Sequence, residues 1–166
     1  VGVDRIISES GVAKMTLYKH FGSKQALIVA ALERKNAQFF AKLHASLDSV
    51  PGGPRERLLA VFDLFGAWFA EPDFHGCLFA HALAEFGAAS HPVFQAVSEQ
   101  KAGLKQRLYR ILEEAMSPEQ AEGASSALLM LIEGATLMAQ LGQGETAIRE
   151  ARKAVASLVA PSESLQ

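Results

Sequence analysis

The hydrophobic residues of this chain recur every three to four positions along almost its whole length. That spacing places them on one face of a helix, whereas a half-exposed strand alternates apolar and polar residues, and no stretch does so convincingly. Pro51-Gly52-Gly53-Pro54 is the strongest break in the pattern, and Pro72, His91-Pro92 and Ser117-Pro118 mark others. The sequence therefore predicts an all-α protein with a small N-terminal head and a larger helical body.

The breaks divide the chain into eight expected helices. The segment from Ala124 to Leu141 is apolar on almost every side, which is not the pattern of an ordinary surface helix. Ser23 is placed to cap the longest helix. The helices are expected approximately over 3–10, 12–22, 24–47, 55–71, 77–89, 93–116, 124–141 and 148–158.

The first two expected helices meet at Gly11-Val12, where a glycine suits the left-handed turn that follows a helix. Two short helices joined in this way are typical of a helix-turn-helix, although short amphipathic pairs also occur without DNA binding. In the second helix, Leu17 and Phe21 lie one turn apart and are expected to face inward. The outward side chains are expected to reach the phosphates and base edges of a major groove; they are Lys14, Thr16, Lys19 and His20.

Charge is distributed unevenly along the chain. The whole sequence of 166 residues has a formal net charge of −2, but residues 1–42 carry +4 and residues 43–166 carry −6. A basic end on an acidic body is expected when that end meets a polyanion. The alternative is a solvated helix face that happens to be rich in lysine.

The stretch from Ile6 to Leu27, IISESGVAKMTLYKHFGSKQAL, resembles the DNA-binding signature of the TetR (tetracycline-repressor) family of bacterial regulators. The resemblance implies a helix-turn-helix DNA-binding domain over 1–30, then an effector-binding and dimerisation domain of TetR type over 31–166. It also implies a homodimer on a double-stranded DNA operator. By the same resemblance, base edges are approached by Lys14, Met15 and Tyr18, and phosphates are held by Thr16, Tyr18, His20 and Lys24.

The sequence departs from the family pattern in three places. The family's first helix is absent from the residues given, and the chain begins with Val1, so we expect the true N-terminus to lie upstream. Ile7 stands where a small residue is usual. Ala13 stands where a capping serine is usual, so the recognition helix is expected to lack one capping bond worth about 1 kcal/mol.

Aromatic residues crowd the helix that follows Pro54. Aromatics at helical spacing usually form core, but in the resembled family the middle helices enclose an effector, so the same rings are candidates for lining a small-molecule site. His81 and Glu85, one turn apart, are the candidate polar contacts; alternatively they are an ordinary exposed pair. The candidate ligand-binding residues are Phe62, Phe65, Trp68, Phe69, His81 and Glu85.

The last two expected helices carry more apolar side chains than one small domain can bury. A second copy of the same surface would complete a four-helix, two-fold interface. Glu133 lies within this region, as a dimer contact, a pocket contact or an open-edge residue. The candidate dimer-interface residues are Leu128, Leu131, Ile132, Ile148, Ala151, Val155 and Leu158.

Several other classes of protein are disfavoured. One cysteine, Cys77, excludes an internal disulfide, and with His75 and His81 it falls short of the four ligands of a structural zinc site. The chain has no GxSxG, Walker or GxGxxG motif, so we expect no enzyme activity, no metal and no cofactor. No apolar run reaches the roughly 18 residues of a membrane helix, so a cytoplasmic protein is expected.

These observations predict a ligand-responsive transcriptional regulator. It is expected to act as a repressor that binds a palindromic operator as a homodimer and is released by a small-molecule effector. The alternative is a helical dimeric ligand-binding module without DNA binding.

Overall fold

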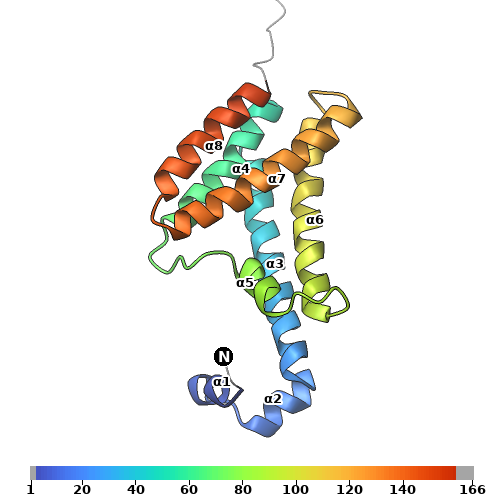
Figure 1. The fold of residues 1–166 in the computed structure, drawn as a ribbon, viewed down its shortest axis with the longest axis vertical. Helices are drawn as coiled ribbons and strands as arrows, with labels where there is room; N and C mark the ends of the chain where they lie inside the picture. Colours follow the sequence, from blue (N-terminus) through green and yellow to red (C-terminus); the bar gives the residue numbers. More distant parts are fainter. Residues whose placement is uncertain (1–2, 160–166) are drawn as a thin grey trace, which may run out of the picture.

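The computed structural model describes residues 3–159, which form eight α-helices and no strand (Figure 1). This confirms the predicted all-α class. The helices are α1 (Val3–Ser10), α2 (Lys14–Phe21), α3 (Lys24–Asp48), α4 (Pro54–Phe69), α5 (Leu78–Glu85), α6 (Pro92–Leu112), α7 (Pro118–Gln140) and α8 (Gly144–Leu158).

The turns between the first three helices follow the predicted chemistry. Gly11 has a φ of 66°, in the left-handed region that favours glycine, and its N–H donates to the Ile7 carbonyl at 3.0 Å. Ser23 caps α3, because its hydroxyl oxygen accepts from the Ala26 N–H at 3.1 Å. The predicted turn at Gly11 and the predicted cap at Ser23 are therefore confirmed.

Helix α3 connects the head to the body. It contains 25 residues, which corresponds to about 37 Å, and Figure 1 shows its lower end beside α2 and its upper part among the body helices. It runs beside α6, where a Cβ on Gly103 would lie 3.0 Å from Cζ of Phe40, so glycine permits this close approach. Helix α3 therefore joins the head to the body as one continuous helix.

The described residues form two apolar cores. The larger core joins α3, α4, α6, α7 and α8, and its fully buried side chains include Leu43, Phe62 and Leu108. The smaller core joins α3, α5 and α6 around Leu32 and Phe79. Helix α3 therefore contributes to both cores, and α5 packs in the smaller one.

Four helix boundaries differ from the predicted ones by four residues or more. Helix α6 ends at Leu112, four residues before the predicted end. Helix α5 stops at Glu85, four residues short of the predicted end, and beyond it the Phe86 ring stacks on the His91 ring with centroids 4.9 Å apart. Helix α7 begins six residues early, because Ser117 and Gln120 form a capping box. Helix α8 begins at Gly144, four residues before the predicted start.

Ion pairs join neighbouring helices of the body. Arg57 on α4 donates to Glu114, just after α6, in a two-point contact. The hydrogen bond from Arg57 holds the pKa of the Glu114 carboxyl below its ordinary value. Separately, none of the described helices has the length and apolar character needed to cross a membrane.

Candidate nucleic-acid interface and effector domain

Helix α2 exposes nearly all of its side chains. Leu17 is its one buried residue, at 5% exposure, whereas Met15 is 86% exposed and Tyr18 is 40% exposed. A shallow surface groove of about 620 Å³ runs over this face, lined by Lys14, Met15, Thr16, Tyr18 and Lys19. The structure thus gathers five of the seven predicted DNA-binding side chains on one exposed surface; His20 is also exposed, and Lys24 is half-buried at the start of α3.

The cationic groups of the head are accessible. Lys14 Nζ lies 3.4 Å from Asp4 Oδ1, but both side chains are largely exposed, and such surface pairs contribute little. Lys19 and Lys24 have no ion-pair partner among residues 3–159. These charges can therefore turn to a polyanion without breaking a stable contact.

The N-terminus of α2 is open. Ala13, the residue before the helix, has extended backbone and provides no side-chain capping bond, as predicted. The first N–H groups of a helix have no partner within the helix, and the helix dipole places partial positive charge there. A phosphate oxygen is a suitable acceptor for these groups.

Phe21 is a correction to the prediction that it faces inward beside Leu17. Its side chain is 38% exposed. Among the described residues, α2 packs against α1 and α3, and this contact buries Leu17 in the middle of the short helix but not its last turn. Helical periodicity identified the shared face correctly, but it does not reveal how far along the helix that face is covered.

The four predicted ligand-binding aromatics of α4 belong to the larger core or pack against it. Phe62 is fully buried and Phe65 is 6% exposed, and both belong to the larger core. Trp68 and Phe69 are half-buried, and the Trp68 ring meets Phe74 edge-on with centroids 4.9 Å apart. The structure therefore packs Phe65, Trp68 and Phe69 with Phe74 into one aromatic cluster. Phe62 lies in the larger core without a ring contact to this cluster among the described residues.

His81 and Glu85 do not join this cluster. Both side chains are exposed on α5, whose buried residues belong to the smaller core. His81 instead contacts the end of α7, because Gln140 Nε2 lies 3.1 Å from His81 Nε2 and donates to the His75 carbonyl at 3.0 Å. Gly76, with a φ of 92°, allows this approach, since a Cβ there would overlap the Gln140 amide. Nothing in the sequence indicates this contact, because its partners are about 60 residues apart.

Glu133 belongs to an ion pair within the chain. Lys101 Nζ on α6 lies 2.6 Å from Glu133 Oε1, and both side chains are mostly buried. The same ammonium lies 3.7 Å from Sγ of Cys77. Among the alternatives left open for Glu133, the structure thus shows a helix-to-helix contact. Within residues 3–159, no three His, Cys, Asp or Glu side chains are grouped closely enough to hold a metal ion.

The predicted dimer-interface residues need correction. Leu128, Ile132, Ala151 and Val155 are at most 2% exposed, because α7 and α8 use them to fill the chain's own core. Leu131 and Ile148 are half-buried against that core, and Leu158 is 41% exposed. These first four side chains do not reach the surface on which a second copy would lie.

A different face of α7 is apolar and exposed. Met130 is 68% exposed, Leu137 is 58% exposed and Leu141 is 65% exposed. With the exposed Ala127 and Gly134 they recur every three to four residues, which places them on one side of the helix. We call these five residues the α7 stripe. The sequence alone shows that these positions are apolar. It does not show which face of the helix is exposed, because the inward face is equally apolar.

Comparisons with known proteins agree on one family. Residues 54–155 match the model of the tetracyclin repressor-like C-terminal domain, and residues 1–31 match that of the bacterial regulatory proteins, tetR family. The HTH-type transcriptional repressor NemR of Escherichia coli (strain K12) is 30% identical over 114 residues, which are 68% of this chain and 57% of that protein. The match therefore spans little more than half the length of this relative.

Solved structures extend the likeness to the whole described fold. A TetR-family transcriptional regulator from Streptomyces coelicolor superposes with a TM-score of 0.88 at 29% identity, covering 95% of this chain and 82% of that one. The reduced form of Escherichia coli NemR superposes with a TM-score of 0.85 at 26% identity, covering 98% and 88% of the two chains.

Proposed function

The chain belongs to the TetR family of bacterial regulatory proteins, and from this membership we propose that it is a ligand-responsive transcriptional repressor. It binds a palindromic DNA operator as a homodimer in the cytoplasm, and a small-molecule effector releases it. The single observation that carries the proposal is the exposed face of α2, where five side chains suited to DNA contact lie together. The relative NemR is itself named a transcriptional repressor.

The residues of α2 divide into two roles. Lys14, Met15 and Tyr18 read base edges, a role that follows from the family resemblance and is compatible with their place on the exposed face of the helix. The positioning contacts go to phosphates and come from Thr16, Tyr18, His20 and Lys24, together with the open N-terminus of α2. Lys19 is free to donate to a phosphate or to a base edge. Base contacts therefore specify the operator, and phosphate contacts fix the register of the helix on it.

The homodimer forms through the α7 stripe. This face is apolar and exposed, in a helix whose opposite face fills the chain's own core. Self-association across a two-fold axis removes the same patch from water in both copies. The two α2 helices then need a spacing of about 34–36 Å to enter successive major grooves.

The effector acts through the body helices and α3. An effector releases DNA only if it binds the DNA-incompetent arrangement more tightly, and a coupling of about 1–3 kcal/mol changes operator affinity about 5- to 150-fold. The body provides the aromatic cluster of α4 for an apolar effector. Helix α3 provides the link, because its side chains lie in both cores and its first turn lies in the head.

A mobility-shift assay with the DNA upstream of the gene tests the proposal. The expected result is a shift that competitor DNA of unrelated sequence does not remove and that weakens steeply with salt. If the protein is a dimer but shifts no DNA at low salt, the operator-binding proposal fails. The alternative, a helical dimeric ligand-binding module without DNA binding, then takes its place.

A further inference from the structure

The loop between α4 and α5, residues 70–76, runs past the end of α7 to reach the start of α5 (Figure 1). Its first half is tied to α4, because the N–H groups of Ala70 and Glu71 donate to carbonyls in the last turn of that helix. Its second half has no such tie, since neither His75 nor Gly76 donates its N–H to a backbone carbonyl of residues 3–159. The second half must therefore be held by side chains.

One side chain of α7 holds the second half of the loop. Gln140 Nε2 donates to the His75 carbonyl at 3.0 Å and lies 3.1 Å from Nε2 of His81, on α5. Gly76 follows His75 with a φ of 92°, and a Cβ there would lie 1.9 Å from Gln140 Nε2. The Gln140 side chain is exposed, so water competes for its hydrogen bonds and their net contribution is small. The loop is thus fixed by a contact that can open.

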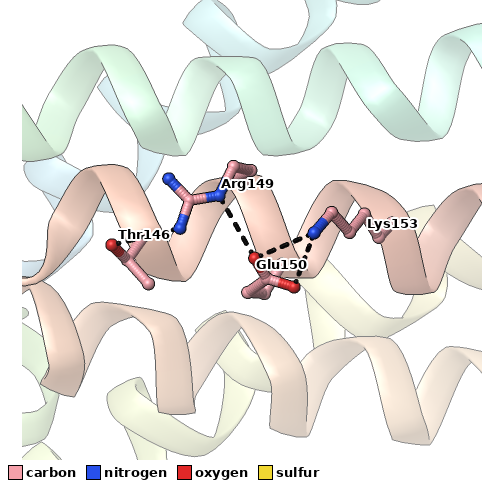
Figure 2. A network of polar contacts seen from close by, with 4 residues as sticks. All are labelled: Thr146, Arg149, Glu150 and Lys153. Carbon is pink, nitrogen blue, oxygen red and sulfur yellow. Dashed lines mark hydrogen bonds and ion pairs between the residues drawn. The ribbon is translucent and has the colours of Figure 1, made fainter.

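No ion pair strengthens this contact among residues 3–159. Figure 2 shows that charged side chains of α8 bond within that helix, Arg149 and Lys153 to Glu150, and none of them bonds to the loop. The acidic residues of the loop, Glu71 and Asp73, have no ion-pair partner in the described part of the chain. Within that part, the α7 amide is the only side-chain group outside the loop that hydrogen-bonds to it.

Phe74, in the middle of the loop, covers part of the aromatic cluster. Its ring meets Trp68 edge-on with centroids 4.9 Å apart and lies 5.3 Å from the Phe69 ring. The other rings of the cluster are on α4 and belong to the larger core or pack against it, whereas Phe74 belongs to neither core. Lifting the loop would therefore uncover Trp68 and Phe69 without disturbing either core.

We propose that residues 70–76 form a lid over the aromatic cluster, held closed by Gln140, and that the effector displaces Phe74 to reach the cluster. An occupant that takes the place of a phenyl ring is itself an apolar ring, and the unpaired carboxylates of Glu71 and Asp73 disfavour an anion beside them. The effector class is thus a neutral aromatic molecule. This inference rests on the proposed function, because it concerns the same effector site.

Titration of the full chain with toluene, a neutral ring that matches the Phe74 side chain, tests the lid. Trp68 is the one tryptophan of the sequence, so its emission reports directly on the cluster. We expect toluene to change this emission in a saturable way, and benzoate, the same ring with a negative charge, to bind at least about tenfold more weakly. No saturable change with toluene, or equal binding of benzoate, overturns the proposal.

Two variants distinguish a lid from an ordinary loop, because both should tighten binding. Gln140→Ala removes the contact that keeps the lid closed, so the open form becomes more populated and the toluene dissociation constant should fall about 2- to 12-fold. Phe74→Ala removes the ring that toluene must displace, and the dissociation constant should fall at least as far. The matched controls, Gln106→Ala and Phe94→Ala on α6, should leave it unchanged. An unchanged or weakened toluene affinity in folded Gln140→Ala overturns the proposal.

This titration contains no DNA, so the lid and the proposed function fail separately. A chain that shifts no operator but binds toluene more tightly as Gln140→Ala supports the lid and loses the repressor function. A chain that shifts its operator but binds no toluene keeps the repressor function and loses the lid.

Discussion

Leu137→Glu should separate the homodimer that we propose into monomers. Leu137 is 58% exposed in the single chain, so a partner would bury more than half of its side chain. Fully burying a leucine contributes about 1.5–3 kcal/mol, so the exposed part contributes about 1–2 kcal/mol in each copy. Two-fold symmetry doubles this to about 2–4 kcal/mol, and the glutamate adds a charge that would have to leave water at each site. We expect the dimer dissociation constant to rise at least about 100-fold.

Sedimentation equilibrium over a range of protein concentrations measures this change directly. Leu78→Glu is the matched control, because it makes the same substitution at a leucine that is 46% exposed on α5, away from the α7 stripe. The control should remain dimeric, and circular dichroism should show both variants folded. A dimer of unchanged affinity in folded Leu137→Glu would refute the assignment of the interface to the α7 stripe.

Three further changes test other parts of the structure. Leu17→Ala should lower the stability of the head by about 2–3 kcal/mol, since Leu17 is the one buried residue of α2. Operator binding should then be lost, while the thermal unfolding of the body stays unchanged. Glu114→Gln should lower the free energy of unfolding at neutral pH by no more than about 1 kcal/mol, measured in urea. That difference should vanish as the pH falls through the lowered pKa of Glu114, because the carboxylate that Arg57 holds is then protonated; a difference that persists in acid argues against the ion pair. Gly76→Ala should lower the melting temperature, because the position has a φ of 92° and no room for a Cβ, whereas Gly123→Ala, with open space around it, should raise it.

The sequence was sufficient to predict the number and order of the helices, and the turn and the cap of the head. Periodicity identified every helix, and the special roles of Gly11 and Ser23 follow from local chemistry, which does not depend on distant parts of the chain. The exposed face of α2 was predictable for the same reason. The exposure of Phe21 was not predictable, because it depends on which helices cover the last turn of α2.

The body was harder to predict because its key contacts are long-range. Helix α7 is apolar on two faces, and composition does not distinguish the face that Leu128 directs into the chain's own core from the face that Met130 presents to solvent. The contact of Gln140 with His81 joins polar side chains with no periodic pattern. The antiparallel packing of α8 on α4, in which Ile148 lies against Gly66, likewise joins two helices 75 or more residues apart in sequence.

We propose that α2 lies in the major groove of duplex DNA, and methylation by dimethyl sulfate tests this placement most directly. The reagent modifies guanine N7 in the major groove and adenine N3 in the minor groove. If α2 lies there, bound protein protects guanine N7 in two patches about 10 base pairs apart, related by a two-fold axis. Protection confined to adenine N3, or a single patch without symmetry, would contradict it.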